Sequence, residues 1–335
     1  MAKRSEELAA MSQVLVDIGG TSIRLGWQSQ KAADVRDPVT YACRDFATPV
    51  DALRQYCDQN QLRVDRVVLA VAAEISGVEV NITNNHWIFN AGELARELRA
   101  KEYLLINDFT AQAFSNLALL SPEPSIIQEH HILLRKGVQA AGSPLLVTGP
   151  GTGLGVAALL PSSSGPMVIE GEGGHASFAP RDEGERNILA ALAAEFGHVS
   201  AERVVSGPGL EAIYKIQNDV RLAAPEIGDG ALAGDNKCLK AVNLMFKSFA
   251  TVIANAALNF GAGSGIVIAG GITPRLRGLL DQSGFYERLG DHGRRSTFLS
   301  DLPIYLAIDP FAGLRGAGHA ARSAQFSHRI GKIIS

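Results

Sequence analysis

The residues of this sequence that could do chemistry are polar side chains in apolar or glycine-rich surroundings. Asn107 and Asp108 directly follow an apolar segment. Glu172 and His175 flank a pair of glycines, and Glu202 follows in a separate segment. A carboxylate can accept hydrogen bonds from two neighbouring hydroxyl groups, and an amide can donate the opposing ones. Together, these side chains suit a neutral polyol such as a sugar better than an anionic substrate.

Each of these side chains also has a structural interpretation. Asp108 could be the N-cap of the helix that follows, because Asp is a preferred cap, and Glu202 could form a capping box with Ser200. Glu172 could lie in a solvated loop, and a lone histidine such as His175 is more often structural than functional. Taken singly, the structural interpretations are at least as good, so the sugar-binding interpretation depends on the combination.

Glycine-rich turns recur at three places in the chain. Residues 17–21 and 148–153 each join two apolar segments, and a glycine pair at 270–271 follows a third apolar run. Backbone N–H groups in such turns form a nest for anions, and glycine allows a phosphate to approach and φ to be positive. The 148–153 turn lacks the lysine of a P-loop and joins strands instead of opening a helix, unlike a dinucleotide fingerprint. The recurrence favours nucleotide binding, whereas any one turn could be an ordinary hairpin.

Asp17 places a carboxylate beside the first glycine turn. A carboxylate repels a phosphate unless a cation lies between them. Asp17 therefore predicts a Mg²⁺ ion that is held through water, since Mg²⁺ usually keeps several of its waters.

The elements that must position these residues alternate between strands and helices. Apolar runs at 14–16, 67–71 and 103–106 predict buried strands, and Thr48-Pro49 predicts the cap and first turn of a helix over 48–59. This alternation is typical of an α/β layered domain, in which catalytic groups often follow the carboxyl end of a strand. The strand–turn–strand pattern recurs in the second half, which suggests two related domains facing each other across a cleft.

Length and composition set the broad class of the protein. A chain of 335 residues predicts two domains. The net charge of −3 disfavours nucleic acid and anionic membranes as partners. Three cysteines without a CxxC pair indicate a reducing compartment and no structural zinc.

One apolar stretch, residues 251–274, carries no charged side chain and is long enough to suggest a membrane span. Asn255, Asn259 and several glycines interrupt it, so a buried helix, a turn and a buried strand are the better prediction. The charged N-terminus, with Lys3 and Arg4, does not resemble a secretory signal. We therefore expect a soluble, cytoplasmic protein without a membrane partner.

The motifs together resemble one family along nearly the whole chain: the bacterial glucokinases of the non-ROK group, within the hexokinase–actin–heat-shock ATPase superfamily. The matching stretches are DIGGTSIR (17–24), TNNHW (83–87), INDFTA (106–111), GPGTGLG (149–155), GEGGHASFAP (171–180), GHVSAERVVSGPG (197–209) and IAGGITPR (268–275). The resemblance implies an α/β, two-domain actin-like ATPase (ribonuclease H-like) fold with a central cleft. The implied domains are a small one at 1–118, completed by the C-terminal helix 312–335, and a large one at 119–311.

The resemblance also implies an activity: ATP-dependent phosphorylation of glucose at its 6-hydroxyl, the first step of glycolysis, with Mg²⁺ and often in a homodimer. It implies that Asp108 is the catalytic base. The implied sugar-binding residues are Asn107, Asp108, Glu172, His175 and Glu202. The implied ATP-binding residues are Asp17, Gly19, Gly20, Thr21, Gly151, Thr152, Gly153, Gly270 and Gly271.

The sequence departs from the family pattern in three places. Ser22 stands where an Asn is common, residues 73–77 replace a more usual Pro-Ile-x-Gly stretch, and about ten extra residues precede the first strand. Two other functions fit the sequence less well. A sugar-responsive repressor would need a helix-turn-helix segment. A scaffold ATPase would not need Glu172, His175 and Glu202. A phosphoryl donor other than ATP, such as ADP or polyphosphate, stays open at this point.

Overall fold

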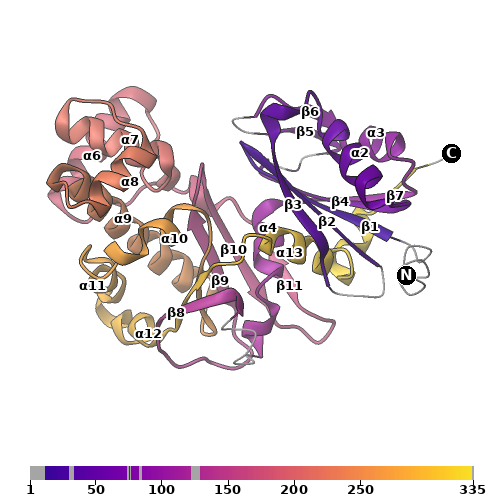
Figure 1. Cartoon of the computed structure of the whole chain (residues 1–335). Coiled ribbons are helices and arrows are strands. Elements are labelled where there is room, and N and C mark those ends of the chain that lie inside the picture. The colour runs from indigo at the N-terminus through magenta and orange to yellow at the C-terminus, as the bar shows by residue number, and fades with distance from the viewer. Residues whose placement is uncertain are drawn as a thin grey trace. The chain divides into compact units, whose positions relative to one another are not determined.

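The computed structural model divides into two units (Figure 1). The residues that it describes are 12–29, 34–73, 75, 77–82, 85–121 and 129–333. Unit 1 consists of Met1–Ala118, Pro161–Glu170 and Asp309–Ser335. Unit 2 consists of Leu119–Leu160 and Gly171–Ile308. The N-terminal extension lies outside the described residues, and so do Glu74, Ser76, Thr83 and Asn84 of the segments named above.

The prediction divided the chain at residues 118 and 311. The structure gives a different assignment for residues 161–170 and for the point at which the chain returns to unit 1. Pro161–Glu170 belongs to unit 1, although the prediction placed it in the large domain, and the return of the chain begins at Asp309. Within unit 1, the Gln325 side chain bonds both backbone groups of Val168, at 2.8 and 2.7 Å, and Thr110 donates to Glu170 at 2.7 Å. The strand in segment 161–170, β11 (Met167–Ile169), is too short to produce a periodic pattern of apolar residues in the sequence.

Unit 1 is built on a six-stranded sheet with the order β14-β7-β4-β1-β2-β3. The strands are β1 (Ser12–Ile18), β2 (Ser22–Ser29), β3 (Arg36–Ala42), β4 (Val64–Val71), β7 (Glu102–Asn107) and β14 (Gly331–Lys332). β1, β4 and β7 are mutually parallel, whereas β2 forms an antiparallel hairpin with β1. The carboxyl ends of the three parallel strands therefore meet at one edge of the sheet.

Alternation along β1 assigns its side chains to the two faces of this sheet. Val14, Val16 and Ile18 belong to a core cluster with residues of α2 (Pro49–Asn60) and α3 (Ala91–Glu97). The predicted helix cap is confirmed, because Thr48 and Asp51 form a capping box at the start of α2. A small hairpin, β5 (Glu79–Asn81) with β6 (Ile88–Asn90), precedes α3.

The opposite face of the unit 1 sheet is covered by α4 (Asp108–Phe114) and α13 (Ala312–Ala320). The two helices approach so closely that a side chain at Gly316 would overlap the Ala111 carbonyl. The Phe114 ring also contacts that of Phe326, in the 3-10 helix η7 (Ala324–Arg329), with centroids 5.9 Å apart. The C-terminal segment thus completes the core of unit 1, but the helix expected over 312–335 ends at Ala320 and is followed by η7 and β14.

Unit 2 repeats the strand arrangement of unit 1. Five strands of unit 2 run in the order β10-β9-β12-β13-β8, with β9 parallel to β12, β12 parallel to β13, and β10 forming an antiparallel hairpin with β9. The strands are β8 (His131–Arg135), β9 (Leu145–Pro150), β10 (Leu154–Leu160), β12 (Gly265–Ile268) and β13 (Ile304–Ala307). The order β7-β4-β1-β2 of unit 1 thus corresponds to β13-β12-β9-β10 here, which confirms the predicted internal repeat.

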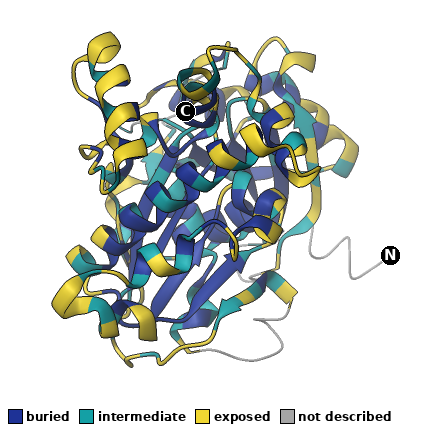
Figure 2. Ribbon diagram, turned by 90° about the vertical axis from the view of Figure 1, so that its left-hand side faces the viewer, coloured by how far each residue is buried: buried dark blue, intermediate teal, exposed yellow. Residues whose placement is uncertain are grey.

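Helices supply most of the rest of unit 2. They are η3 (Gly173–His175), α6 (Glu183–Phe196), η4 (Ala201–Arg203), α7 (Gly207–Asn218), α8 (Ala224–Leu232), α9 (Asn236–Phe260), α10 (Ile272–Leu276), η5 (Arg277–Leu279), α11 (Phe285–Gly290), η6 (Gly293–Arg295) and α12 (Ser296–Asp301). Figure 2 shows that buried residues gather along the strands and on the inner faces of the helices.

Helix α9 is the part of the described chain that is long and apolar enough to span a membrane. Within its most apolar window, 72% is buried inside the structure. The helix ends at Gly261, whose φ is 62°, and β12 follows. The predicted sequence of buried helix, turn and buried strand is therefore confirmed.

The close crossing of α4 and α13 generates a stability prediction. We expect Gly316→Ala to lower the free energy of unfolding by about 1–3 kcal/mol, because the added methyl group must displace backbone in a packed core. Urea denaturation of the purified protein measures the change. Gly278→Ala is the matched control, since its methyl group would meet nothing within 4 Å. Equal stability of the two variants would contradict the close contact between the helices.

Candidate active site

Three parallel strands of unit 1 bring two groups of predicted site residues to one edge. The register aligns Ile18 on β1 with Val71 on β4, and Val71 with Asn107 on β7. Neighbouring strands lie about 4.8 Å apart, so the ends of β1 and β7 are separated by roughly 10 Å. Asp17 and Asn107 therefore belong to the same edge although they are 90 positions apart in the sequence.

Asp17 is a buried carboxylate with a cationic partner. It is 6% exposed, and its Oδ2 accepts a hydrogen bond of 3.1 Å from Arg24, the residue opposite it in the β1–β2 hairpin. Burial raises the pKa of Asp17, and the charge of Arg24 opposes that increase. Gly313 of α13 leaves just enough space, because a side chain there would overlap the carboxylate. The position of the Asp17 carboxylate is therefore fixed by the core of unit 1.

Hydrogen bonds to its backbone hold the turn that follows Asp17. The Gly19 N–H donates to the Ser22 carbonyl at 3.0 Å, and the Gly19 carbonyl accepts from the Asn85 amide at 3.1 Å. The Thr21 carbonyl accepts from the Cys43 N–H, also at 3.0 Å. Sequence reasoning missed the roles of Asn85 and Cys43, because both contacts depend on tertiary structure.

Asn107 and Asp108 have different places at the start of α4. Asn107 is the N-cap: its Oδ1 accepts from the Phe109 N–H at 2.8 Å, and its amide donates to the Ala73 carbonyl at 3.3 Å. Asp108 is the first helical residue, and its Oδ1 accepts from the same N–H at 2.9 Å. The interpretation of Asp108 as the N-cap is therefore wrong, because Asn107 occupies that position.

In unit 2, the loop of Glu172 and His175 packs against the start of β10. Glu172 forms a parallel bridge with Val156, and a side chain at Gly174 would overlap the Leu154 carbonyl. The side chains of Glu172 and His175 are 63% and 60% exposed, with Oε2 and Nε2 3.8 Å apart. The backbone of the loop is thus fixed while the two polar groups face solvent.

Glu202 lies on η4 and reaches the same end of β10. Its Oε2 accepts a hydrogen bond of 2.8 Å from the Leu154 N–H. The capping-box interpretation is wrong, since Ser200 makes no side-chain cap bond. The Ala201 N–H donates to the Ala176 carbonyl at 2.8 Å, which joins η4 to the loop that carries His175. The structure therefore brings Glu172, His175 and Glu202 together around one strand end.

The 149–153 turn lies beside the predicted glycine pair 270–271. A side chain at Gly149 would overlap the backbone of Ala269, and Gly270 has a φ of 79° with the Pro150 carbonyl only 2.5 Å from where a methyl group would be. By contrast, a methyl group at Gly151 or at Gly271 would meet nothing within 4 Å. Gly149 and Gly270 are thus needed for backbone packing, whereas Gly151 and Gly271 present open backbone where a ligand can approach.

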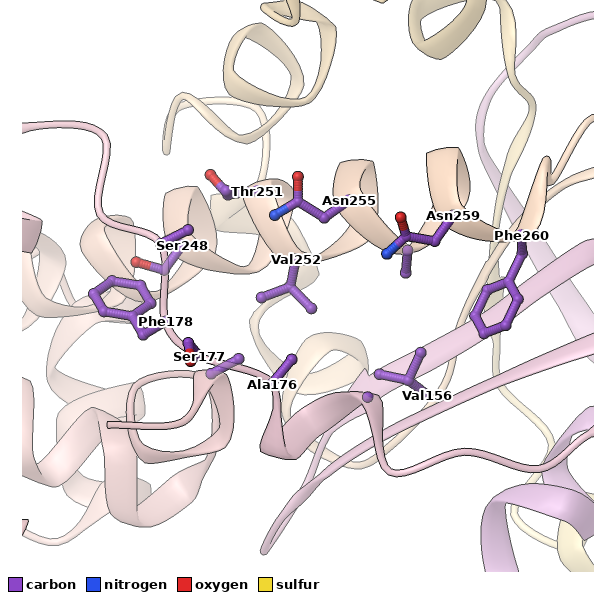
Figure 3. A pocket seen from close by; sticks show the side chains of 14 residues that line it. Val156, Ala176, Ser177, Phe178, Ser248, Thr251, Val252, Asn255, Asn259 and Phe260 are labelled. Carbon is purple, nitrogen blue, oxygen red and sulfur yellow. The ribbon is translucent and has the colours of Figure 1, made fainter. Parts of the chain in front are cut away.

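A pocket of about 140 Å³ lies behind the Glu172–His175 loop, between that loop and α9 (Figure 3). Its lining residues are Val156, Gly173, Ala176, Ser177, Phe178, Ala179, Ala201, Ser248, Thr251, Val252, Asn255, Ala256, Asn259 and Phe260. Polar side chains of α9 line one side, and none of the lining residues is charged. The pocket therefore adds no candidate catalytic group to the site.

The donor set near the first turn fits Mg²⁺ only in company with phosphates. In the parts of the chain that the structure describes, no three His, Cys, Asp or Glu side chains form a group suited to a metal ion. Mg²⁺ is commonly bound through one or two carboxylates, waters and substrate phosphates. A single fixed carboxylate such as Asp17, beside a glycine turn, fits that kind of site.

The two classes of glycine generate the next prediction. We expect Gly149→Ala to lower the free energy of unfolding by about 1–3 kcal/mol, since the methyl group would overlap backbone. Gly151→Ala, in the same turn, should stay within about 0.5 kcal/mol of the unmodified protein. Thermal and urea denaturation measure both values. A stable Gly149→Ala variant would contradict the close approach of the turn to Ala269.

Comparison with known proteins agrees with this geometry. The glucokinase family model matches residues 14–324. A glucokinase of Chromobacterium violaceum is 37% identical over 321 residues, which cover 93% of this chain and 90% of that protein. Among solved structures, a glucokinase from an Antarctic psychrotroph has a TM-score of 0.78 at 29% identity, covering 93% of this chain and 99% of the other.

Two more distant structures share the fold. A Balamuthia mandrillaris glucokinase, solved in complex with glucose, has a TM-score of 0.77 at 21% identity and covers 96% of this chain and 98% of its own. A ROK-family glucokinase from Streptomyces griseus, solved with glucose and AMPPNP, has a TM-score of 0.62 at 18% identity, with 93% and 99% covered. These matches and the repeated strand order confirm the predicted α/β, two-domain actin-like ATPase fold. The chain belongs to the glucokinase family.

Proposed function

We propose that this enzyme transfers the terminal phosphoryl group of ATP to the 6-hydroxyl of glucose, giving glucose 6-phosphate and ADP. The observation that carries the proposal is the meeting of two binding regions at the start of β10. There, the candidate sugar residues Glu172, His175 and Glu202 adjoin the 149–153 turn. Family membership supports the same substrates, since the glucokinase family model matches residues 14–324 and a curated relative at 37% identity is a glucokinase.

The sugar set has the chemistry that a hexose requires. Glu172 and His175 expose a carboxylate and an imidazole 3.8 Å apart, a spacing that lets both groups bond neighbouring ring hydroxyls. Glu202 adds a second carboxylate from η4. The resemblance also assigns Asn107 and Asp108 to sugar binding.

Asp108 is proposed as the general base. As the 6-hydroxyl oxygen forms its bond to the γ-phosphorus of ATP, the hydroxyl proton passes to the Asp108 carboxylate and ADP leaves. The Asn107 cap fixes the backbone from which Asp108 projects. Phosphoryl transfer depends mainly on such positioning and on electrostatic stabilisation.

The nucleotide is proposed to bind at the glycine turns. Gly151 and Gly271 present open backbone in unit 2, and Thr152 and Gly153 complete that turn. Gly19, Gly20 and Thr21 form the corresponding turn of unit 1. Asp17 would hold Mg²⁺ through water, and the metal ion would neutralise phosphate charge. A cytoplasmic homodimer that supplies glycolysis is the form and role expected from the resemblance.

Replacing the base tests the mechanism directly. We expect Asp108→Asn to lower kcat by about 10²–10⁴, the usual contribution of a general base, while glucose affinity weakens only modestly. A coupled assay measures kcat, and calorimetric titration measures the affinity for glucose. Near-native kcat in this variant would refute Asp108 as the base.

The matched control is Asp235→Ala. Asp235 is another aspartate at a helix N-terminus and accepts from the Cys238 N–H at 2.8 Å. Its loss should lower stability by about 1 kcal/mol, as for other N-caps, and leave kcat unchanged. A similar loss of kcat in both variants would show that the effect comes from helix capping instead of proton transfer.

Sugar specificity provides a second test. Glucose should be preferred over galactose and allose, because the wrong epimer leaves a polar group of the site without its partner. Such a group costs about 1–3 kcal/mol, or roughly 5- to 150-fold in kcat/KM. Equal kcat/KM for the three sugars would contradict the assignment of Glu172, His175 and Glu202.

A further inference from the structure

Glu202 contacts the nucleotide turn as well as belonging to the candidate sugar set. We propose that Glu202 is a positioning residue that holds the 149–153 turn in its nucleotide-binding form. Because the same carboxylate belongs to the proposed sugar site, sugar binding would also restrict the movement of that turn. This inference deepens the proposed function and depends on its assignment of the sugar and nucleotide regions.

The carboxylate of Glu202 closes the C-terminal end of the turn. Oε2 accepts from the Leu154 N–H at 2.8 Å, and it lies 2.5 Å from where a methyl group on Gly153 would be. The turn therefore rests against the carboxylate, and a glycine at 153 is what allows the contact. A hydrogen bond to an ionised acceptor is stronger than one between neutral groups.

The segment that carries Glu202 also holds the other end of the turn. The Gly207 N–H donates to the Gly151 carbonyl at 2.9 Å. Ser206 donates to the Glu202 carbonyl at 2.7 Å and accepts from the Gly209 N–H at 3.0 Å as the N-cap of α7. A segment fixed at the start of α7 thus binds both Gly151 and Leu154, and it determines the shape of the turn between them.

The same segment is joined to the candidate sugar loop. The Phe178 N–H donates to the Val199 carbonyl at 2.9 Å, next to the bond between Ala201 and Ala176. A carboxylate has two oxygens that accept hydrogen bonds, so one can hold Leu154 while the other accepts from a sugar hydroxyl. Sugar binding would then restrict Glu202 and, through it, the nucleotide turn.

The substitutions at position 202 separate these roles. Glu202→Gln keeps an oxygen that can accept from the Leu154 N–H, but it loses the charge and one acceptor. Glu202→Ala loses the support of the turn altogether. We expect Glu202→Ala to weaken ADP binding about ten-fold without any sugar present, the size expected for one hydrogen bond to a charged group. Glu202→Gln should weaken ADP binding only about three-fold, because it keeps the bond to the Leu154 N–H but loses the charge of the acceptor.

The matched control is Glu172→Ala. Glu172 is a carboxylate of the same proposed sugar set, but its charge lies beside His175 and its side chain is 63% exposed. We expect this variant to lose glucose affinity while it binds ADP as the unmodified protein does. The difference in ADP affinity between Glu202→Ala and Glu172→Ala therefore measures the contribution of the contact between Glu202 and the 149–153 turn.

Two measurements on the full chain decide the question. Calorimetric titration with ADP and Mg²⁺, in the absence of sugar, gives nucleotide affinity, and hydrogen exchange resolved at the Leu154 amide reports the bond itself. The proposal predicts faster exchange in Glu202→Ala, protection retained in Glu202→Gln, and ten-fold weaker ADP binding only in Glu202→Ala. Melting temperatures identify any variant that fails to fold.

Two results would overturn the proposal. The first is a folded Glu202→Ala variant with native ADP affinity and a protected Leu154 amide. The second is an equal loss of ADP affinity in Glu172→Ala or in Glu202→Gln. Absence of glucose turnover in the unmodified enzyme would contradict the proposed function instead, and the ADP titrations would still decide the role of Glu202.

Discussion

A tight hairpin beside a parallel strand is the arrangement on which both units depend. In unit 1 the β1–β2 turn lies at the carboxyl edge where β4 and β7 also end, and in unit 2 the β9–β10 turn lies beside the end of β12. Parallel strands place their carboxyl ends at the same edge. Residues distant in sequence therefore meet there with open backbone turns, which is the geometry that a polar substrate and a phosphate need.

Close backbone approach limits which residues can occupy these edges. Gly149 lies against Ala269, Gly174 against Leu154 and Gly313 against Asp17, and none of the three positions has space for a methyl group. Packing of this kind makes each turn part of a core instead of a mobile loop. Polar groups such as Asp17 and Glu202 thereby have fixed positions before any ligand binds, and fixed positions are what electrostatic catalysis requires.

Local patterns in the sequence predicted most of the helices and buried strands. Contacts between residues distant in sequence determine the edge strands and the hydrogen bonds of the site, and these were not predicted. The Thr48-Pro49 cap and the buried strands at 67–71 and 103–106 were found in the structure because their signals lie within a few residues. The apolar helix that follows Asn107 ends at Phe114, where the side chains of Ser115 and Asn116 bond back to the Gln112 carbonyl, and nothing in the local sequence predicts that end. Strands β3 and β8 were missed, since edge strands acquire much of their form from the partner strand. The candidate residues were recognised by type and order, but the bond between Glu202 and Leu154 spans 48 positions and leaves no sequence signal.

The proposed function depends on one chemical event: formation of a phosphate ester at the 6-hydroxyl of glucose. Phosphorus NMR of the purified enzyme with MgATP and glucose tests this most directly, because coupling to the attached protons identifies the esterified carbon. We predict a single new ester resonance, coupled to the two protons on carbon 6, that grows in equal amount to ADP. ATP consumed to ADP and inorganic phosphate without an ester, or an ester at another carbon, would contradict the account.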